Sequence, residues 1–419
     1  MLVEFSVANF RSFLERQTLS MVGRERSGAE SAHSMRSGHS SVPLLLSGAA
    51  LFGPNGSGKS NFLDAMGFLD HFVYESAQGH SKRFFQVSPF KLDEVAEKSP
   101  SEFEIIFIEN GNLYQYGFSV DRERVHEEWM FFTPEGGKRS QRWFERRFDR
   151  ATNEYSWYIN PAVKGPRETW RSATRDDALF FSTAILLNAE PFKEARGWFR
   201  KLRPWAASEA FGEEVSAEAC LDESKRQEVL RFLNAADVPI ADIKIQEIPI
   251  EESDFIKTVP DDLRAKLIEN MKGRIDYKIR LGHKNRSGGV TYFDFNEEST
   301  GTRVLFNLSS VWKSALQNGH VIVVDELSNS LHPLVFEMIV SLFSNPEVNI
   351  GKAQLIFTSH DTHLMAPKFL DRDQIWFLEK LDGASVLTAL ASFKARSNEA
   401  FEKGYLGGRY GALPNIREL

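Results

Sequence analysis

The segment from Leu51 to Asn61 constrains this chain more than any other. It reads LFGPNGSGKSN, which matches the phosphate-binding spacing G-x-x-x-x-G-K-[ST]. A loop of this kind follows a buried strand and opens a helix, so that backbone N–H groups surround the phosphates of a nucleotide. The apolar run 44–52 predicts the strand, and helical spacing behind the loop predicts the helix, through Phe62, Leu63, Met66 and Leu69. The segment therefore predicts a nucleotide-binding α/β fold.

Each position of this phosphate-binding loop (P-loop) has an expected task. Glycines at 53, 56 and 58 let the backbone approach the phosphates, which side chains would obstruct. We expect Lys59 to reach the β- and γ-phosphates of ATP, and Ser60 to offer its hydroxyl to Mg²⁺. The expected nucleotide-contacting residues are Gly53, Pro54, Asn55, Gly56, Ser57, Gly58, Lys59, Ser60 and Asn61.

A second strand ends in two carboxylates. Four apolar residues, Val321 to Val324, precede Asp325 and Glu326. We expect Asp325 to hold Mg²⁺ directly or through water, and Glu326 to orient and deprotonate the attacking water. An acidic pair that merely closes a strand is the alternative. The P-loop in the same chain favours the catalytic interpretation.

Three further residues are candidates for the same site. His360 follows the apolar strand 354–359 and is expected to reach the γ-phosphate, because α/β sheets bind ligands at the carboxyl ends of their strands. Ser299 and Gly301 open a helix in a Ser-x-Gly pattern, which suits an anion but also occurs as an ordinary helix cap.

Two weaker candidates lie in loops. Arg11 interrupts two N-terminal strands and is a candidate nucleotide contact, with a solvated turn arginine as the alternative. Gln86 is a candidate for the metal site and for sensing the γ-phosphate, with a structural role as the alternative. Residues 24–41 are rich in Ser, Gly and Arg and are expected to form a mobile loop.

The remaining patterns predict a split organisation. Alternating residues predict an N-terminal hairpin over 2–22 and an antiparallel meander over 103–132, with Asn110-Gly111 as a turn. A nucleotide-binding domain that is split in sequence is expected over 1–187 and 275–419, with a helical insert over 188–274. Within the insert, apolar positions 192–202 predict one helix, Asp222 caps a second and 260–273 forms a third.

The stretch 138–150, KRSQRWFERRFDR, interleaves basic and aromatic residues. Binding of a nucleic-acid backbone uses this mixture, whereas a half-exposed strand with a charged outer face is the alternative. Because the net charge of the chain is −7, any nucleic-acid contact requires a local basic patch.

Composition excludes other classes. No run approaches 18 apolar residues, so no membrane span is expected, and the single Cys220 leaves no intrachain disulfide. A reducing cytoplasm is the expected location.

The order of these motifs resembles that of ABC-type ATPase heads in the AAA family, within the RecF/SMC/OLD branch. The opening NFRSF (9–13) and the phrase DELSNSLHP (325–333) look most like ATPases of bacterial abortive-infection and anti-phage systems, such as the AbiL/RloA-like, Septu and PARIS ATPases. The resemblance implies a P-loop NTPase of α/β class with a two-lobed head, in which a mixed sheet and an antiparallel meander carry a short helical insert. It also implies Mg²⁺-dependent ATP hydrolysis and an ATP-dependent head-to-head dimer, in which Ser299 and Gly301 contact the nucleotide of the partner subunit.

Some residues depart from that pattern. The signature reads STGTR where relatives have LSGGQ, and Ser328 stands where relatives often carry Asp. Two functions remain open: control of a separately encoded nuclease or toxin effector, with DNA or a phage protein as trigger, or a RecF-like role in DNA repair or replication. The tail after Arg396, rich in glycine and aromatic residues, either holds that effector or packs on its own head.

Overall fold

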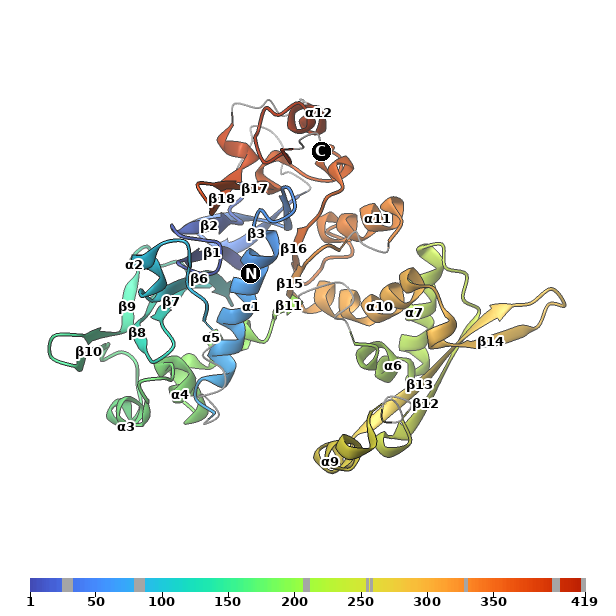
Figure 1. The fold of residues 1–419 in the computed structure, drawn as a ribbon, viewed down its shortest axis with the longest axis horizontal. Helices are drawn as coiled ribbons and strands as arrows, with labels where there is room; N and C mark the ends of the chain where they lie inside the picture. Colours follow the sequence, from blue (N-terminus) through green and yellow to red (C-terminus); the bar gives the residue numbers. More distant parts are fainter. Residues whose placement is uncertain are drawn as a thin grey trace. The chain divides into compact units, whose positions relative to one another are not determined.

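The structure is a computed structural model. It describes residues 1–24, 33–78, 87–205, 212–253, 256, 259–327, 331–393 and 400–415. The chain forms two compact units (Figure 1). Unit 1 comprises Met1–Ala207, Ala315–Ser328 and Ile339–Leu419, and unit 2 comprises Ser208–Ser314 and Asn329–Met338.

A six-stranded sheet in unit 1 positions the predicted site. Its order is β11-β15-β16-β5-β17-β18. These strands are β11 (Leu202–Trp205), β15 (Val321–Val324), β16 (Gln354–Thr358), β5 (Gly48–Phe52), β17 (Ile375–Leu381) and β18 (Ala384–Ala389). The first five run parallel, and only the β17–β18 pair is antiparallel. Because parallel strands are covered on both faces, β5, β15 and β16 consist almost wholly of buried residues.

A seven-stranded antiparallel sheet forms the rest of the unit 1 core, in the order β10-β9-β8-β7-β6-β1-β2. Its strands are β1 (Leu2–Ala8), β2 (Gln17–Ser20), β6 (Ser101–Glu109), β7 (Asn112–Val120), β8 (Val125–Thr133), β9 (Gln141–Asp149) and β10 (Glu154–Ile159). The expected hairpin and meander are therefore confirmed. Asn110 and Gly111 both have positive φ, 47° and 79°, as a two-residue turn between twisted strands requires. The mixed α/β fold class expected from the sequence is confirmed by these two sheets and their helices.

The apolar run 44–52 is two strands, and the prediction of one was wrong. β4 (Val42–Leu46) pairs antiparallel with β3 (Ser34–His39), and Ser47 then separates it from β5, which enters the parallel sheet. Part of the expected mobile loop is therefore a strand, because the apolar β4 gives residues 34–39 a pairing partner. Residues 25–32 lie outside the described part of the chain.

The boundary between the units differs from the expected one. Helix α4 (Phe180–Leu186) lies in unit 1, within the range expected for the head, but α5 (Lys193–Phe199), which falls in the range expected for the insert, belongs to unit 1 as well. The ring of Trp198 in α5 stacks on Phe107 with centroids 4.2 Å apart. Leu202 does not continue a helix but begins β11, where it pairs with Val321. Local helical spacing predicted one helix over 192–202, and the long-range pairing of β11 with β15 ends that helix before Leu202.

Unit 2 contains a three-stranded sheet, β12-β13-β14, with helices. Its elements are α6 (Glu214–Cys220), α7 (Glu223–Ala235), β12 (Asp242–Pro249), α9 (Asp261–Met271), β13 (Ile275–Lys284) and β14 (Val290–Asp294), followed by α10 (Thr300–Asn318), which continues into unit 1. The predicted cap is confirmed, because the carboxylate of Asp222 accepts a hydrogen bond from Lys225 N at 3.0 Å.

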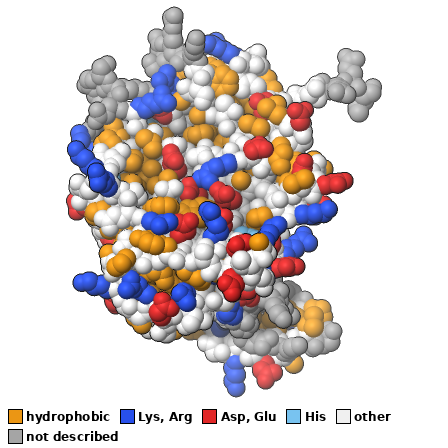
Figure 2. Space-filling view, turned by 90° about the vertical axis from the view of Figure 1, so that its left-hand side faces the viewer, with side chains coloured by type: hydrophobic (Ala, Val, Ile, Leu, Met, Phe, Trp, Pro, Cys, Tyr) orange, Lys and Arg blue, Asp and Glu red, His pale blue; other side chains and the backbone are white. Residues whose placement is uncertain are grey.

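The basic stretch 138–150 contains β9, and the three arginines of that strand are paired with glutamates. Arg146 is 1% exposed and lies 3.1 Å from the carboxylate of Glu128. Two exposed arginines also pair, Arg142 with Glu145 at 2.8 Å and Arg147 with Glu127 at 3.0 Å. The face of the molecule drawn in Figure 2 shows basic and acidic side chains intermixed. The half-exposed strand is thus the interpretation that fits.

The described tail, residues 400–415, packs on unit 1. Its helix α12 (Phe401–Leu406) places Tyr405 against Phe377 of β17, with stacked rings 5.1 Å apart, and Tyr410 stacks on the same ring at 5.6 Å. The Oγ1 of Thr362 donates a hydrogen bond to Glu402 of this helix at 2.8 Å. Of the two roles considered for the tail, this packing is the one that the structure contains.

Candidate functional site

The P-loop leaves β5 and enters α1 (Lys59–Glu75), as the sequence predicts. A Cβ on Gly53 would collide with the carbonyl oxygen of Leu378, and one on Gly58 would collide with the hydroxyl of Ser385. Gly58 also has a φ of 109°, in the region that favours glycine. The position of Gly56 is different, since a Cβ there would meet nothing within 4 Å. Gly53 and Gly58 therefore let the loop pack against β17 and β18, whereas Gly56 leaves the outer face of the loop open.

The start of α1 offers donors to an anion. The first intrahelical hydrogen bond runs from Phe62 N to Gly58 O at 3.0 Å. The N–H groups of residues 59–61 precede that bond and belong to the unpaired end of the helix, which attracts phosphate. The ammonium of Lys59 lies over the loop, donating to Gly53 O at 2.8 Å and Pro54 O at 3.1 Å. These residues fit the phosphates of a nucleotide.

The two carboxylates lie at the end of β15, held by the neighbouring strand. The hydroxyl of Thr358, the last residue of β16, donates to Asp325 Oδ1 and accepts a hydrogen bond from Glu326 N at 2.7 Å. Glu326 has a φ of 48°, a left-handed conformation that costs about 1 to 3 kcal/mol and persists where its surroundings fix it. Thr358 is a positioning residue that the sequence reasoning missed, although its place before Ser359-His360 was a signal.

His360 faces the same carboxylate. Its Nε2 lies 4.0 Å from Glu326 Oε1, and both side chains are 45% exposed. Burial, and secondarily the nearby ammonium of Lys59, lower the pKa of His360 below its ordinary value. Burial also lowers the pKa of Lys59, against the opposing carboxylates of Asp325 and Glu326. The ring of His360 is therefore neutral at neutral pH.

Arg11 lies beside the P-loop helix. Its guanidinium pairs with Asp64 and lies 3.4 Å from Asn61 Oδ1. The backbone around it is held in a rare conformation, with φ of 50° at Arg11 and 48° at Asn9. Three carbonyl oxygens accept hydrogen bonds from the Asn9 amide, those of Ala96, Ser99 and Pro100. Positive φ at both residues fits a tight turn, and Arg11, whose side chain is 43% exposed, stays a candidate nucleotide contact with the solvated turn arginine as the alternative.

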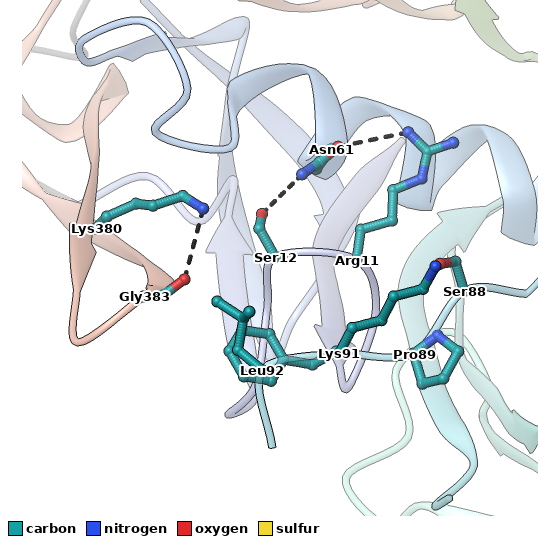
Figure 3. Close-up of a pocket in the computed structure, with 10 residues that line it drawn as sticks. Arg11, Ser12, Asn61, Ser88, Pro89, Lys91, Leu92, Lys380 and Gly383 are labelled. Carbon is teal, nitrogen blue, oxygen red and sulfur yellow. Dashed lines mark hydrogen bonds between the residues drawn. The ribbon is translucent and has the colours of Figure 1, made fainter. Parts of the chain in front are cut away.

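A cavity of about 400 Å³ opens next to Arg11 (Figure 3). Three cations lie around it, Arg11, Lys91 and Lys380, from three separate segments. Its wall includes Ser12 and Asn61, whose amide donates to the Ser12 hydroxyl at 2.8 Å. The cavity is thus continuous with the end of the P-loop.

The metal candidates are Ser60 and Asp325. No group of three or more His, Cys, Asp or Glu side chains able to hold a metal occurs in the described part of the chain. A P-loop magnesium site needs only one or two carboxylates, with the remaining ligands from phosphate and water. These two residues suit such a site. Gln86 lies outside the described residues.

The Ser-x-Gly candidates belong to the other unit. Ser299 caps α10, because its hydroxyl accepts a hydrogen bond from Thr302 N at 3.1 Å, and Gly301 lies in the first turn. The structure therefore gathers the P-loop, Asp325, Glu326, His360 and Arg11 in unit 1, and leaves Ser299 and Gly301 in unit 2. Residues 328–330 lie outside the described ranges.

Comparison with known families is consistent with this geometry. Residues 49–366 match the family described as "AAA domain, putative AbiEii toxin, Type IV TA system". The chain belongs to this AAA family. The membership expected from its motifs is thereby confirmed. No curated protein matches this AAA protein.

Two solved structures are similar to this AAA protein over most of its length. One is the Smc head domain of Pyrococcus furiosus, with an extended coiled coil and bound to the C-terminal domain of ScpA. It is 13% identical, the match covers 94% of this chain and 97% of that chain, and the TM-score is 0.37. The other is the recombination mediator protein RecF-ATPrS of the RecFOR pathway, 14% identical over 93% of this chain and 98% of that chain, with a TM-score of 0.31. Within its described residues, this AAA protein has no helix long and apolar enough to cross a membrane.

Proposed function

We propose that this AAA protein binds ATP with Mg²⁺ and hydrolyses it. The observation that carries the proposal is the meeting of Lys59, Glu326 and His360 at the carboxyl edge of one parallel sheet, where α/β folds bind their ligands. Membership of the AAA family supports it.

Each residue of the site has a separate role in the transfer of the γ-phosphoryl group to water. The loop N–H groups and Lys59 bind and orient the phosphates, while Ser60 and Asp325 would hold Mg²⁺. Bound Mg²⁺ neutralises charge on the phosphate oxygens. Glu326 accepts the proton of the attacking water, and the neutral His360 donates a hydrogen bond toward the γ-phosphate. The strained backbone of Glu326, fixed by Thr358, aims the carboxylate before the water arrives.

The cavity beside Asn61 is the space that we assign to the nucleotide next to the P-loop. Arg11, Lys91 and Lys380 surround it, so its walls favour a ligand that carries phosphate. Arg11 would exchange its pairing with Asp64 for a phosphate oxygen.

Replacing Glu326 with Gln tests the hydrolysis. The amide keeps the shape but cannot accept the proton, so turnover should fall by roughly 10²-fold or more while ATP still binds. Glu347→Gln, at an exposed glutamate, is the matched control and should leave turnover unchanged. Wild-type turnover in Glu326→Gln would refute the assignment of the base, and no turnover by the wild-type protein would refute the proposed activity.

We propose in addition that ATP drives head-to-head pairing of two copies. Ser299 and Gly301 open α10 in unit 2, and the resemblance to ABC-type heads assigns such residues to the nucleotide of the partner subunit. Sedimentation of Glu326→Gln with and without ATP checks this. A monomer at micromolar concentration with saturating ATP would count against it.

For the cellular role, we propose control of a separately encoded effector in anti-phage defence, in a reducing cytoplasm. The family description names a toxin and a toxin–antitoxin system, which supports an effector partner. Plaque formation on cells carrying the gene with its neighbours, compared between wild type and Glu326→Gln, provides the test. Equal protection from both would oppose the role of ATP turnover, and repair of DNA lesions without protection would favour the RecF-like alternative.

A further inference from the structure

A second cavity, of about 380 Å³, opens in unit 2 beside β12 and β13. Half of its lining residues are cations, contributed by α7 and by both strands. The lining consists of Arg226, Lys244, Lys278, Arg280, Asp242, Ile243, Ile245 and Gln246. The carboxylate among them, Asp242, accepts a hydrogen bond from Tyr292 Oη at 2.5 Å. We call the four cations the unit 2 cationic pocket.

The strand register places like charges together in this pocket. Lys244 lies directly opposite Arg280, an arrangement that destabilises an antiparallel pair. Lys244 rests over the ring of Tyr292, 3.8 Å from its centroid, and Arg280 is 3.8 Å from Asp294 Oδ1. Over the described ranges, neither Lys244 nor Lys278 has a carboxylate oxygen within 4.0 Å. The fold therefore tolerates a repulsion that an anionic ligand would relieve.

Arg226 supports the same conclusion from the helix side. Its guanidinium pairs with Glu223 through Nη2, but its buried Nε lacks an acceptor among the residues that the structure describes. A buried donor without a partner calls for an explanation, and an anion in the adjoining cavity would provide one.

The basic strand β9 of the same chain provides a comparison, because its cations have a structural role. Arg142, Arg146 and Arg147 each lie 3.1 Å or less from a glutamate oxygen. Glutamates of the protein compensate their charges, whereas Lys244 and Lys278 are exposed and have no carboxylate oxygen within 4.0 Å among the described residues. The basic sequence of β9 is therefore a poorer candidate for binding an anion than the scattered cations of unit 2.

The cations continue along one strand, which distinguishes a polymer from a single phosphate. Lys278, Arg280 and Lys284 occupy even positions of β13 and share one face, because side chains alternate along a strand. From the first to the third the strand rises about 20 Å, at about 3.3 Å per residue. One phosphate group reaches only one or two of them.

We propose that the unit 2 cationic pocket, extended by Lys284, binds the phosphodiester backbone of a nucleic acid. Lys and Arg contacts to phosphate supply affinity without reading sequence, and they release counterions, so affinity falls with salt. This function goes beyond ATP turnover and does not depend on it. It gives the chain a local basic surface despite its net charge of −7.

The test measures anisotropy of a labelled 30-base-pair DNA with the full chain, without nucleotide, between 50 and 300 mM KCl. The triple variant Lys244→Ala, Lys278→Ala and Lys284→Ala should lower the slope of log K against log salt by about 2 to 3, because each phosphate contact contributes about 0.9. The matched control, Arg142→Gln with Arg147→Gln, should keep the wild-type slope. Parallel titrations with single-stranded DNA and with RNA of equal length show which kind of nucleic acid the protein prefers.

Several outcomes overturn the proposal. They are absence of wild-type binding to all three nucleic acids at 50 mM KCl, an unchanged slope in the triple variant, and an equal loss in the control. Binding of tripolyphosphate without binding of nucleic acid also overturns it, in favour of a small anion. Thermal unfolding checks that each variant is folded. ATP hydrolysis is measured in parallel, so that failure of the proposed ATPase activity remains distinguishable from failure of this surface.

Discussion

The hydrogen bond from Thr362 to Glu402 predicts that the tail of the chain controls ATP turnover. Thr362 begins a short 3₁₀ helix (Thr362–Met365) two residues after His360, and Glu402 lies on α12, which stacks on β17 through Tyr405. Removing the carboxylate by Glu402→Ala releases this loop from the tail. His360 then samples positions that do not reach the γ-phosphate, so Glu402 is a positioning residue that acts through His360.

The magnitude follows from the geometry. The Oγ1–Oε1 distance is 2.8 Å and the acceptor is a carboxylate, so the bond contributes about 1.5 to 3 kcal/mol, nearer the lower value because both residues are half-buried. A barrier difference of about 1.4 kcal/mol is tenfold in rate. If between half and all of that free energy holds the loop, kcat should fall by about 3- to 10-fold, with the ATP dissociation constant nearly unchanged.

Steady-state hydrolysis and nucleotide titration measure the two quantities. Thr362→Val should match Glu402→Ala, and the double variant should lose no more than either one, because both remove the same bond. Glu402→Gln and Thr362→Ser, which keep an acceptor and a hydroxyl, should restore most of kcat. Tyr405→Phe removes a different tail bond, from Tyr405 Oη to Ala412 O at 2.8 Å, and serves as control. An equal loss of kcat in that control, or an unchanged pH–rate profile in Glu402→Ala despite lower kcat, would refute positioning through His360.

Three further predictions concern the scaffold. Glu128→Ala should lower the free energy of unfolding in urea by about 3 to 5 kcal/mol, because it leaves the buried Arg146 without its carboxylate partner. Glu127 has a side chain that is 39% exposed, so Glu127→Ala should lower the free energy of unfolding by at most about 1 kcal/mol. Equal losses in the two variants would contradict this prediction. Gly58→Ala should weaken ATP binding at least about tenfold, because the added Cβ collides with Ser385. Gly38→Ala is the control, since Gly38 has a φ of 86° but a Cβ there meets nothing within 4 Å, and this variant should bind ATP normally. Titration of both variants with ATP measures the two affinities. Burial raises the pKa of Asp70 to about 7, so the folded state keeps a proton that the unfolded chain releases above about pH 4, and stability is lost as pH rises through 7. Asp70→Asn should therefore raise the melting temperature at pH 8 and leave it unchanged at pH 4, and equal shifts at both pH values would refute this.

Local patterns predicted the parts of the fold that depend on neighbours in sequence. The P-loop, the strand before Asp325 and the turn at Asn110-Gly111 each carry their determinants within about a dozen residues. The same holds for the cap at Asp222. These elements form where the sequence places them because spacing and turn chemistry act locally.

Features that depend on strand register were not predictable in this way. Leu202 continues an apolar helical stripe, yet it pairs with Val321, more than a hundred residues away. The role of Thr358 exists only because β16 lies beside β15. The unit 2 cationic pocket likewise combines residues 226, 244, 278 and 280, which no single stretch of sequence brings together.

The hydroxyl of Ser385 has a consequence for how the protein is made. It donates to Ser57 O in the P-loop at 2.6 Å and lies 2.8 Å from the Ser12 hydroxyl, and the strands beside β5 are β16 and β17. Ser385, β16 and β17 all lie about 300 or more residues after the P-loop that they support. During translation the P-loop therefore leaves the ribosome long before β16, β17 and Ser385 have been synthesised. Competence to bind ATP should appear abruptly, once residues near 385 have been synthesised, so that an unfinished chain would not compete for nucleotide.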